Sequence, residues 1–272
     1  AFALRYLCRI NTPQEVCEGD DPAAVGICLH DTLRLLYEPW IHREVHRGDI
    51  GIKEIRACFA RVMETADLQR LLPADSCLML ESSAPLRLLN FLQAQPETTT
   101  ILALEEKIEV TLKLCDRSYV FAGQIDRLDR RDGRLHVLDY KSGVIKKGDN
   151  SLWTDIAFFN RVAQGLPVHD EMTKLFAELR ERLPSLQLPC YISMLKAARK
   201  GSIGDAALVD LRESGKEMPL FGGLEDIDLD NALHYCDLTL ALVLQHLENA
   251  PALEARPDRH CQWCAYADIC AS

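Results

Sequence analysis

The residues of this chain best suited to chemistry lie in segment 123–143, which reads GQIDRLDRRDGRLHVLDYKSG. Strand-like alternation flanks Asp132-Gly133 on both sides, and Asp-Gly between two such stretches predicts a two-residue hairpin turn. A turn centred there brings Asp126 directly opposite Asp139, on one face of an antiparallel pair. Lys141 follows Asp139 by two residues and therefore shares that face. The hairpin thus predicts two carboxylates and one ammonium at a single place.

Facing carboxylates repel each other across a ladder, so this pair requires a cation or a raised pKa. Oxygen ligands of this kind suit Mg²⁺ or Mn²⁺, which take further ligands from a phosphate substrate. The pattern favours metal-dependent hydrolysis of a phosphodiester, in which Lys141 orients the attacking water or stabilises the developing charge. The alternative is a solvated hairpin whose charged residues form surface ion pairs, because Asp-x-Lys by itself is common.

Length and composition describe a globular chain of 272 residues, long enough for one large domain or two small ones. No apolar run approaches the ~20 residues of a membrane span, and the first residues do not resemble a signal peptide. The formal charge of −10 argues against a general nucleic-acid coat, so any DNA contact must be a local groove. The odd, scattered set of 11 cysteines indicates a reducing compartment. We expect a cytoplasmic protein without a membrane partner.

The helix that precedes the hairpin contributes a candidate histidine. Asp21-Pro22 is a good helix start, apolar residues then recur at helical spacing from Leu29, and Pro39 marks the end. His30 flanks this apolar stripe and could reach a site beside the core. A single helical histidine is, however, more often structural or exposed than a ligand.

The remaining elements follow from changes of period along the chain. Residues 47–95 predict further helices without evident chemistry, and a period of two predicts a three-stranded meander over 107–114, 119–126 and 135–140. A fourth strand is predicted over 206–211, and helices near 155 and over 169–182, 185–195 and 232–247. Gln187 and Tyr191 are at i and i+4 of one of these helices, on one face. At that spacing the usual interpretation is a pair of half-buried polar residues.

The C-terminal segment concentrates three cysteines, Cys261, Cys264 and Cys270, within ten residues. Use as small hydrophobic residues does not explain this clustering, so metal ligation is the better interpretation. Zinc sites and iron–sulfur clusters usually complete a set of four ligands. His260 or Cys8 could supply the fourth ligand for zinc, and a redox or structural-thiol role is the alternative.

Five motifs in chain order resemble those of PD-(D/E)XK nucleases of the RecB/AddB type, the nuclease domains of bacterial helicase–nuclease complexes that process DNA double-strand breaks. Each motif is weak alone, but together they argue against the solvated hairpin. The matches are G-x3-H at Gly26 and His30, G-x-x-D-R-x-D at 123–129, D-Y-K-S-G at 139–143, Q-x3-Y at Gln187 and Tyr191, and C-x2-C-x5-C at Cys261, Cys264 and Cys270.

The resemblance implies an α/β fold with a restriction-endonuclease-like core, in which a helix precedes a mixed central sheet that contains the catalytic hairpin and has flanking helices. We expect a single nuclease domain over 1–272, with a helical insertion over 43–100 and a cysteine-rich tail over 255–272. The resemblance further implies a site of defined roles. His30, Asp126 and Asp139 would hold Mg²⁺ or Mn²⁺ with the Tyr140 carbonyl, Lys141 would be the catalytic lysine, and Gln187 and Tyr191 would shape the site.

The function that the resemblance implies is a metal-dependent DNA exonuclease of an AddB-like break-repair enzyme, with a helicase domain or subunit as partner. The three tail cysteines would hold a [4Fe–4S] cluster. In relatives the fourth cysteine lies in a Cys-Pro ahead of a helix that resembles 2–10, so we expect this fragment to lack one cluster ligand. Cys8 is about two turns too far along that helix to replace it.

Two alternatives to this function remain, of which the first has the same motifs and cysteines. The first is the CRISPR-adaptation nuclease with an iron–sulfur cluster, for which the separation of His30 from Asp126 is too long. The second is a catalytically silent DNA-binding scaffold, as some halves of paired nucleases are. The scaffold is disfavoured because His30, Asp126, Asp139 and Lys141 are all present.

Overall fold

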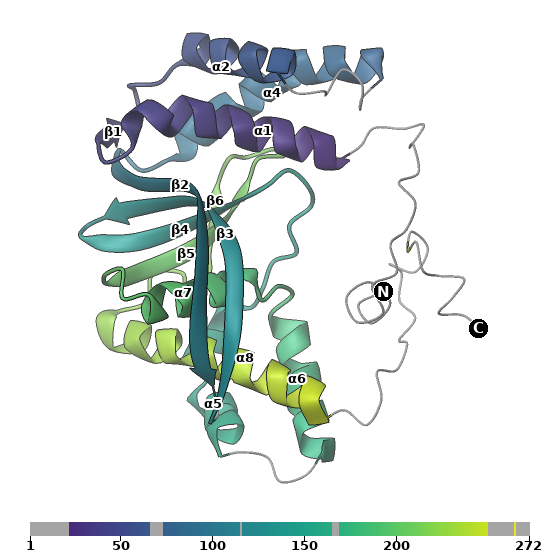
Figure 1. The fold of residues 1–272 in the computed structure, drawn as a ribbon, viewed down its shortest axis with the longest axis vertical. Coiled ribbons are helices and arrows are strands. Elements are labelled where there is room, and N and C mark those ends of the chain that lie inside the picture. The colour runs from purple at the N-terminus through teal and green to yellow at the C-terminus, as the bar shows by residue number, and fades with distance from the viewer. Residues whose placement is uncertain (1–21, 66–72, 115, 165–168, 250–263, 265–272) are drawn as a thin grey trace.

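The computed structural model describes residues 22–65, 73–114, 116–164, 169–249 and 264. In these residues a mixed sheet lies between two groups of helices (Figure 1). The first half of the chain forms α1 (Pro22–Tyr37), η2 (Glu38–Trp40), β1 (Glu44–His46), α2 (Ile52–Thr65), α4 (Ala74–Ala94), β2 (Thr98–Leu114), β3 (Arg117–Arg131) and β4 (Arg134–Lys141). The second half forms η3 (Asn150–Thr154), α5 (Ile156–Ala163), α6 (His169–Arg182), α7 (Gln187–Ala197), β5 (Ile203–Asp210), β6 (Glu217–Pro219) and α8 (Asp226–Asn249).

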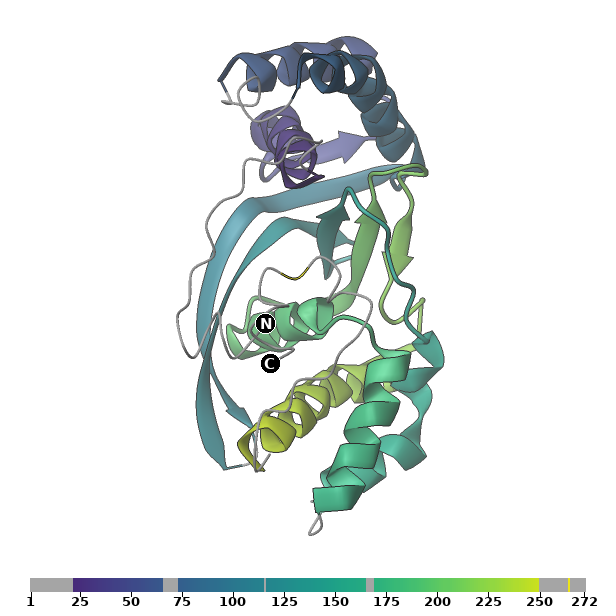
Figure 2. The ribbon, with the colours of Figure 1, turned by 90° about the vertical axis from the view of Figure 1, so that its right-hand side faces the viewer.

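The six strands are ordered β1-β2-β3-β4-β5-β6, and every neighbouring pair is antiparallel except β4 and β5. A parallel pair requires a crossover, which here contains η3 and α5 to α7. β2 and β3 are much longer than the other strands and curve along one side of α7 (Figure 2). The mixed α/β fold expected from the sequence is confirmed.

The hairpin between β3 and β4 has the predicted turn and register. Asp132 and Gly133 have φ angles of 49° and 78°, as a type I′ turn requires at its two central positions. The ladder runs from Arg131 opposite Arg134 to Arg127 opposite Leu138. At the next step the Asp126 side chain accepts a hydrogen bond from the Tyr140 backbone N–H, with a distance of 2.7 Å. The Asp126 side chain therefore connects β3 to β4 at the end of the hairpin that lies away from the turn.

Alternation along β4 divides the apolar residues between two cores. Leu138 and Tyr140 pack with α1, α2 and α4, whereas Leu135 and Val137 pack with α5 to α8. In Figure 1, α1, α2 and α4 lie at the top of the view, α5, α6 and α8 lie toward the bottom, and α7 lies between them. Asp139 pairs in register with Leu208 of β5, which packs against the core beneath α5 to α8. Asp139 consequently belongs to the side of the sheet that α7 covers.

The strands and the helices predicted after residue 20 are present, and the strands of the meander are longer than their periodic stretches. The helix expected over 2–10 lies outside the described residues. The sequence analysis missed β1 and β6, because edge strands of three residues are too short to show a period. The boundaries of a helical insertion over 43–100 stay a prediction; this range contains α2 and α4 but also β1 and the first residues of β2. Among the described helices, none has the length and apolar character that crossing a membrane requires.

Candidate active site

His30 on α1 contacts the end of the β3–β4 hairpin. Its Nε2 lies 3.1 Å from the Tyr140 carbonyl oxygen, and its Nδ1 lies 3.6 Å from Asp126 Oδ2. The close approach of α1 depends on Gly26, one turn earlier, where an added Cβ would lie 3.0 Å from Ser142 Oγ. The spacing G-x3-H therefore has a steric reason, because the glycine allows the helix to approach and the histidine uses that approach.

Asp126 is a largely buried carboxylate, and the positive charge near it does not offset the effects of burial and of the neighbouring carboxylates on its pKa. Its side chain is 12% exposed, and its Oδ2 accepts the Tyr140 N–H. Burial raises the pKa of Asp126 to about 6, and the negative charge of Asp139 adds to this rise, while His30 opposes it. The hydrogen bond from Tyr140 also favours the ionised form but does not outweigh burial.

Glu105 on β2 is a member of this site that the sequence analysis missed. One ligand atom from each of His30, Glu105 and Asp126 falls in a group whose members lie within 4.8 Å of one another. Glu105 has a φ of 49°, a left-handed conformation inside a long strand, and its Oε2 accepts a 2.6 Å hydrogen bond from Gln124 Nε2. Glu105 precedes the first strand predicted from the sequence, 107–114, so only the local backbone conformation reveals the position of this carboxylate.

Lys141, Gln187 and Tyr191 form a hydrogen-bonded chain between β4, α7 and β3. Lys141 Nζ is ion-paired with Asp139 and donates to Gln187 Oε1 at 2.9 Å. Gln187 Nε2 donates to the Tyr191 hydroxyl at 3.0 Å, and this hydroxyl donates to the Gln124 carbonyl at 2.6 Å. The i,i+4 pair on α7 is therefore a connected unit that fixes the lysine.

Gln124 joins the two halves of the site. Its side-chain amide donates a hydrogen bond to Glu105, and its backbone carbonyl accepts a hydrogen bond from the Tyr191 hydroxyl. The preceding Gly123 leaves room for the tyrosine, since a Cβ there would lie 3.1 Å from Tyr191 Cε1. Burial raises the pKa of Asp139, and the hydrogen bond from Lys141 opposes the rise. The structure thus brings together all six residues that the sequence singled out, although their catalytic roles stay a prediction.

Comparison with known protein families shows which family this chain belongs to. A family described as the PD-(D/E)XK nuclease superfamily matches residues 1–271. The chain belongs to the PD-(D/E)XK nuclease superfamily. No curated protein matches the chain significantly. Among solved structures, one described as "Crystal structure of SSO0001" is similar to this chain, with 16% sequence identity and a TM-score of 0.30. The matched region covers 90% of this chain and 84% of the other chain.

Nucleases of this superfamily use divalent metals, and the donor set of the candidate site fits such an ion. His30, Glu105 and Asp126 offer one nitrogen and two carboxylates at close range. Mg²⁺ and Mn²⁺ favour oxygen ligands, and Mn²⁺ also accepts imidazole nitrogen. The raised pKa of Asp126 indicates that the protein alone does not balance this negative charge. A cation at this position would balance it.

The second aspartate of the D-R-x-D motif lies in a different environment. Asp129 is fully buried and accepts two hydrogen bonds from Arg127, of 2.7 and 2.9 Å, and one from Arg131 of 2.9 Å. Arg131 also pairs with Glu217 at 2.7 Å, and the Arg127 guanidinium lies 4.3 Å from the centroid of the Tyr37 ring. These residues connect β3 to β6 and α1. They hold the strand that carries Asp126.

The predicted cysteine site falls mostly outside the described part of the chain. Cys8, His260, Cys261 and Cys270 lie outside the described residues, as does most of the tail over 255–272. Cys264 is described as half-buried and forms no disulfide. The iron–sulfur assignment therefore stays a prediction.

Proposed function

We propose that the protein is a Mg²⁺- or Mn²⁺-dependent DNA exonuclease of the RecB/AddB type. It acts in the cytoplasm with a helicase domain or subunit in the repair of double-strand breaks. Superfamily membership supports the nuclease activity. The single observation that carries the proposal to this site is the convergence of His30, Glu105 and Asp126 beside the Asp139–Lys141 pair. The motif pattern of the sequence supports the exonuclease, repair and helicase parts.

The chain's own residues divide the work between metal binding and transition-state stabilisation. His30, Asp126 and Asp139 would hold the divalent ion with the Tyr140 carbonyl, and Glu105 would join them. When bound, such an ion polarises a phosphate oxygen and lowers the pKa of water. The Tyr140 carbonyl and N–H face His30 and Asp126 respectively, so this one peptide segment orients both groups.

Lys141 would supply a further positive charge beside the metal-binding residues. Its Nζ is held by Asp139 and Gln187, so the ammonium is already oriented before substrate arrives. A charge placed in advance lowers the barrier because it needs no reorganisation as negative charge develops. Gln187 and Tyr191 act through Lys141 by fixing its position.

The test is cleavage of end-labelled single- and double-stranded DNA by the purified protein with Mg²⁺ or Mn²⁺. Lys141→Ala should lower kcat by about 10²–10³-fold and leave the Kd for DNA nearly unchanged, because the lysine acts chiefly in the transition state. Lys113→Ala, an exposed lysine at the far end of β2, is the matched control and should keep full activity. Equal activity of Lys141→Ala and the unmodified protein would contradict the proposed site, and DNA binding without cleavage would favour the scaffold.

The proposal includes a [4Fe–4S] cluster held by Cys261, Cys264 and Cys270. Their spacing is its sole support, since cluster ligation uses cysteine thiolates in closely spaced groups. Iron and acid-labile sulfide should be measured in protein purified without oxygen, with Cys264→Ser for comparison. Bound zinc without iron would overturn the cluster and leave the nuclease proposal standing.

A further inference from the structure

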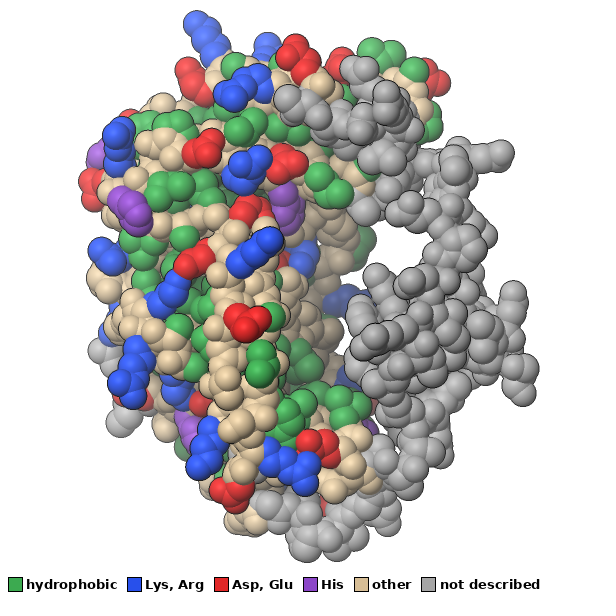
Figure 3. Space-filling view, in the orientation of Figure 1, with side chains coloured by type: hydrophobic (Ala, Val, Ile, Leu, Met, Phe, Trp, Pro, Cys, Tyr) green, Lys and Arg blue, Asp and Glu red, His purple; other side chains and the backbone are tan. Residues whose placement is uncertain are grey.

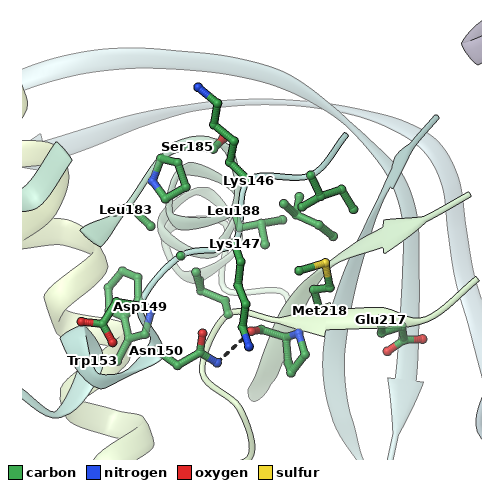
Figure 4. A pocket seen from close by; sticks show the side chains of 16 residues that line it. Lys146, Lys147, Asp149, Asn150, Trp153, Leu183, Ser185, Leu188, Glu217 and Met218 are labelled. Carbon is green, nitrogen blue, oxygen red and sulfur yellow. Dashed lines mark hydrogen bonds between the residues drawn. The ribbon is translucent and has the colours of Figure 1, made fainter. Parts of the chain in front are cut away.

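A pocket of about 330 Å³ lies between the loop that follows β4, the start of α7 and the edge formed by β5 and β6 (Figure 4). Most of its wall is apolar, with Trp153, Leu188, Leu208 and Met218 among the lining residues. Its volume is at the lower end for small-ligand sites, which are mostly apolar with a few fixed polar groups. The pocket has room for one flat ring system but not for a folded peptide.

The pocket is directly beside the candidate active site. Its lining residue Leu208 is the β5 partner of Asp139, and Leu188 follows Gln187, which holds Lys141. Ile145, also in the wall, is four residues from Lys141, so their Cα atoms are at most about 14 Å apart. A ligand in the pocket could therefore be covalently connected to a phosphate at the active site by a short linkage.

The balance of charge in the pocket favours an anionic ligand. Both lining carboxylates are paired with arginines: Asp149 lies 3.0 Å from Arg182, and Glu217 lies 2.7 Å from Arg131. Lys147 also belongs to the wall and is exposed. Figure 4 shows Lys146 and Lys147 leaving the loop in opposite directions. The protein has a net charge of −10, and acidic and basic side chains are interspersed on the face drawn in Figure 3.

Fixed backbone contacts hold the walls of the pocket in place. The Asp149 N–H donates to the Arg182 carbonyl at 2.8 Å, and an added Cβ at Gly148 would lie 3.3 Å from the same oxygen. Across the pocket, Asn150 Nδ2 donates to the Pro219 carbonyl at 3.1 Å. This hydrogen bond uses one N–H of the Asn150 amide, and the other N–H and the Oδ1 can pair with the edge of a ligand. The site is therefore formed before a ligand binds.

We propose that this pocket binds one nucleobase of single-stranded DNA, next to the phosphate that is cleaved. The inference rests on the proposed nuclease function and names its substrate form. A base is flat and apolar on its faces and polar on its edge, which matches apolar walls with one fixed amide. Its own backbone phosphate then pairs with Lys147. A base inside a duplex is stacked and paired, so it cannot enter unless it is first unstacked. The pocket consequently selects single strands and frayed ends.

The experiment measures binding to a short fluorescent oligothymidylate and to an abasic strand of the same length, by fluorescence anisotropy with Ca²⁺ replacing Mg²⁺ to slow cleavage. The unmodified protein should bind oligothymidylate about 5- to 20-fold more tightly than the abasic strand, as expected for one sequestered base. Met218→Trp places an indole ring in the pocket and leaves less room for a base, so it should abolish this ratio without weakening binding to the abasic strand. Lys147→Ala should weaken both strands equally, because it contacts phosphate.

Val120→Trp is the matched control, since Val120 is 69% exposed on β3 and does not line the pocket. It introduces the same aromatic ring and should keep the ratio of the unmodified protein. If Met218→Trp lowers the melting temperature, Met218→Phe provides the same test with less added volume. An undiminished ratio in the folded filled variant, or no ratio in the unmodified protein, would overturn the pocket proposal.

Cleavage assays with Mg²⁺ on the same strands separate this inference from the proposed function. DNA cleavage without base-dependent binding means that the nuclease proposal holds and the pocket proposal fails. In the opposite outcome, the unmodified protein does not cleave DNA but shows base-dependent binding that Met218→Trp abolishes. The pocket proposal then holds and the nuclease proposal fails.

Discussion

Asp126 and Asp129 are on the same strand, three residues apart, and both carboxylates are largely removed from water, but their neighbours carry opposite charge. Asp129 is surrounded by the guanidinium groups of Arg127 and Arg131. Asp126 lies near Glu105 and Asp139, with His30 as its closest partner of potential positive charge. The charge of Asp129 is neutralised by its own neighbours, and the pair holds the fold together. The charge of Asp126 is not neutralised by its neighbours, so a cation from solution can bind there.

Asp205 shows that a raised pKa alone does not identify such a site. Burial raises the pKa of Asp205 to about 6, as it does for Asp126. Asp205, however, accepts backbone N–H groups from Ala206, Phe221 and Gly222 at 2.7, 3.0 and 3.2 Å, and these bonds connect β5 to the segment after β6. The distinguishing property of Asp126 is therefore the presence of like charges with convergent ligand atoms.

The largest expected effect comes from Asp126→Asn. Loss of a metal-binding carboxylate removes several kcal/mol of transition-state stabilisation, so kcat should fall about a thousandfold. The melting temperature at neutral pH without metal should stay the same or rise, because the amide still accepts the Tyr140 N–H and removes an unbalanced charge. Steady-state cleavage of labelled DNA and thermal unfolding measure the two quantities. A large fall in melting temperature would mean that Asp126 stabilises the fold as Asp129 does.

Asp129→Asn should produce the opposite result. This substitution leaves Arg127, which is fully buried, without its bidentate carboxylate. Removing one partner of a buried ion pair typically costs about 3–5 kcal/mol of unfolding free energy. Denaturant unfolding checks this value, with Asp132→Asn at the exposed turn as the control. If the stability of Asp129→Asn equalled that of the unmodified protein, the contrast between the two aspartates would have no energetic basis.

The sequence contained the information for the hairpin because turn type, register and side-chain alternation are local properties. Asp132-Gly133 determined the pairing, and the pairing placed Asp126 near Asp139. Glu105 could not be found in this way, since its position depends on a left-handed residue within a strand that has no glycine there. The roles of Arg127 and Asp129 were also missed, because the burial of their pair depends on packing against Tyr37, which is distant in the chain.

The pH dependence of stability should distinguish Asp126 from its amide variant. The folded pKa of Asp126 is raised to about 6 from 3.8, so its contribution to stability is fully present below about pH 4 and is lost as the pH rises through 6. Without metal, the unfolding free energy of Asp126→Asn relative to the unmodified protein should thus rise by about 2 kcal/mol between pH 4 and 7. Denaturant titrations in EDTA measure this difference. Adding Mn²⁺ at pH 7 should remove it, and a difference that does not vary with pH would contradict the electrostatic account.

The smallest expected effect concerns Tyr191, which belongs to neither aspartate but connects the site to α7. Tyr191→Phe leaves the Gln124 carbonyl and the Gln187 amide without the hydroxyl that joined them. An unmade hydrogen bond of this kind costs about 1–2 kcal/mol of unfolding free energy. Because Gln187 then holds Lys141 less firmly, kcat should fall several-fold while KM changes little. Tyr235→Phe, on α8, is the matched control for losing a hydroxyl from a buried tyrosine and should keep full kcat. A fall in kcat as large as that of Lys141→Ala would instead mean that the Tyr191 hydroxyl itself contacts the reacting phosphate.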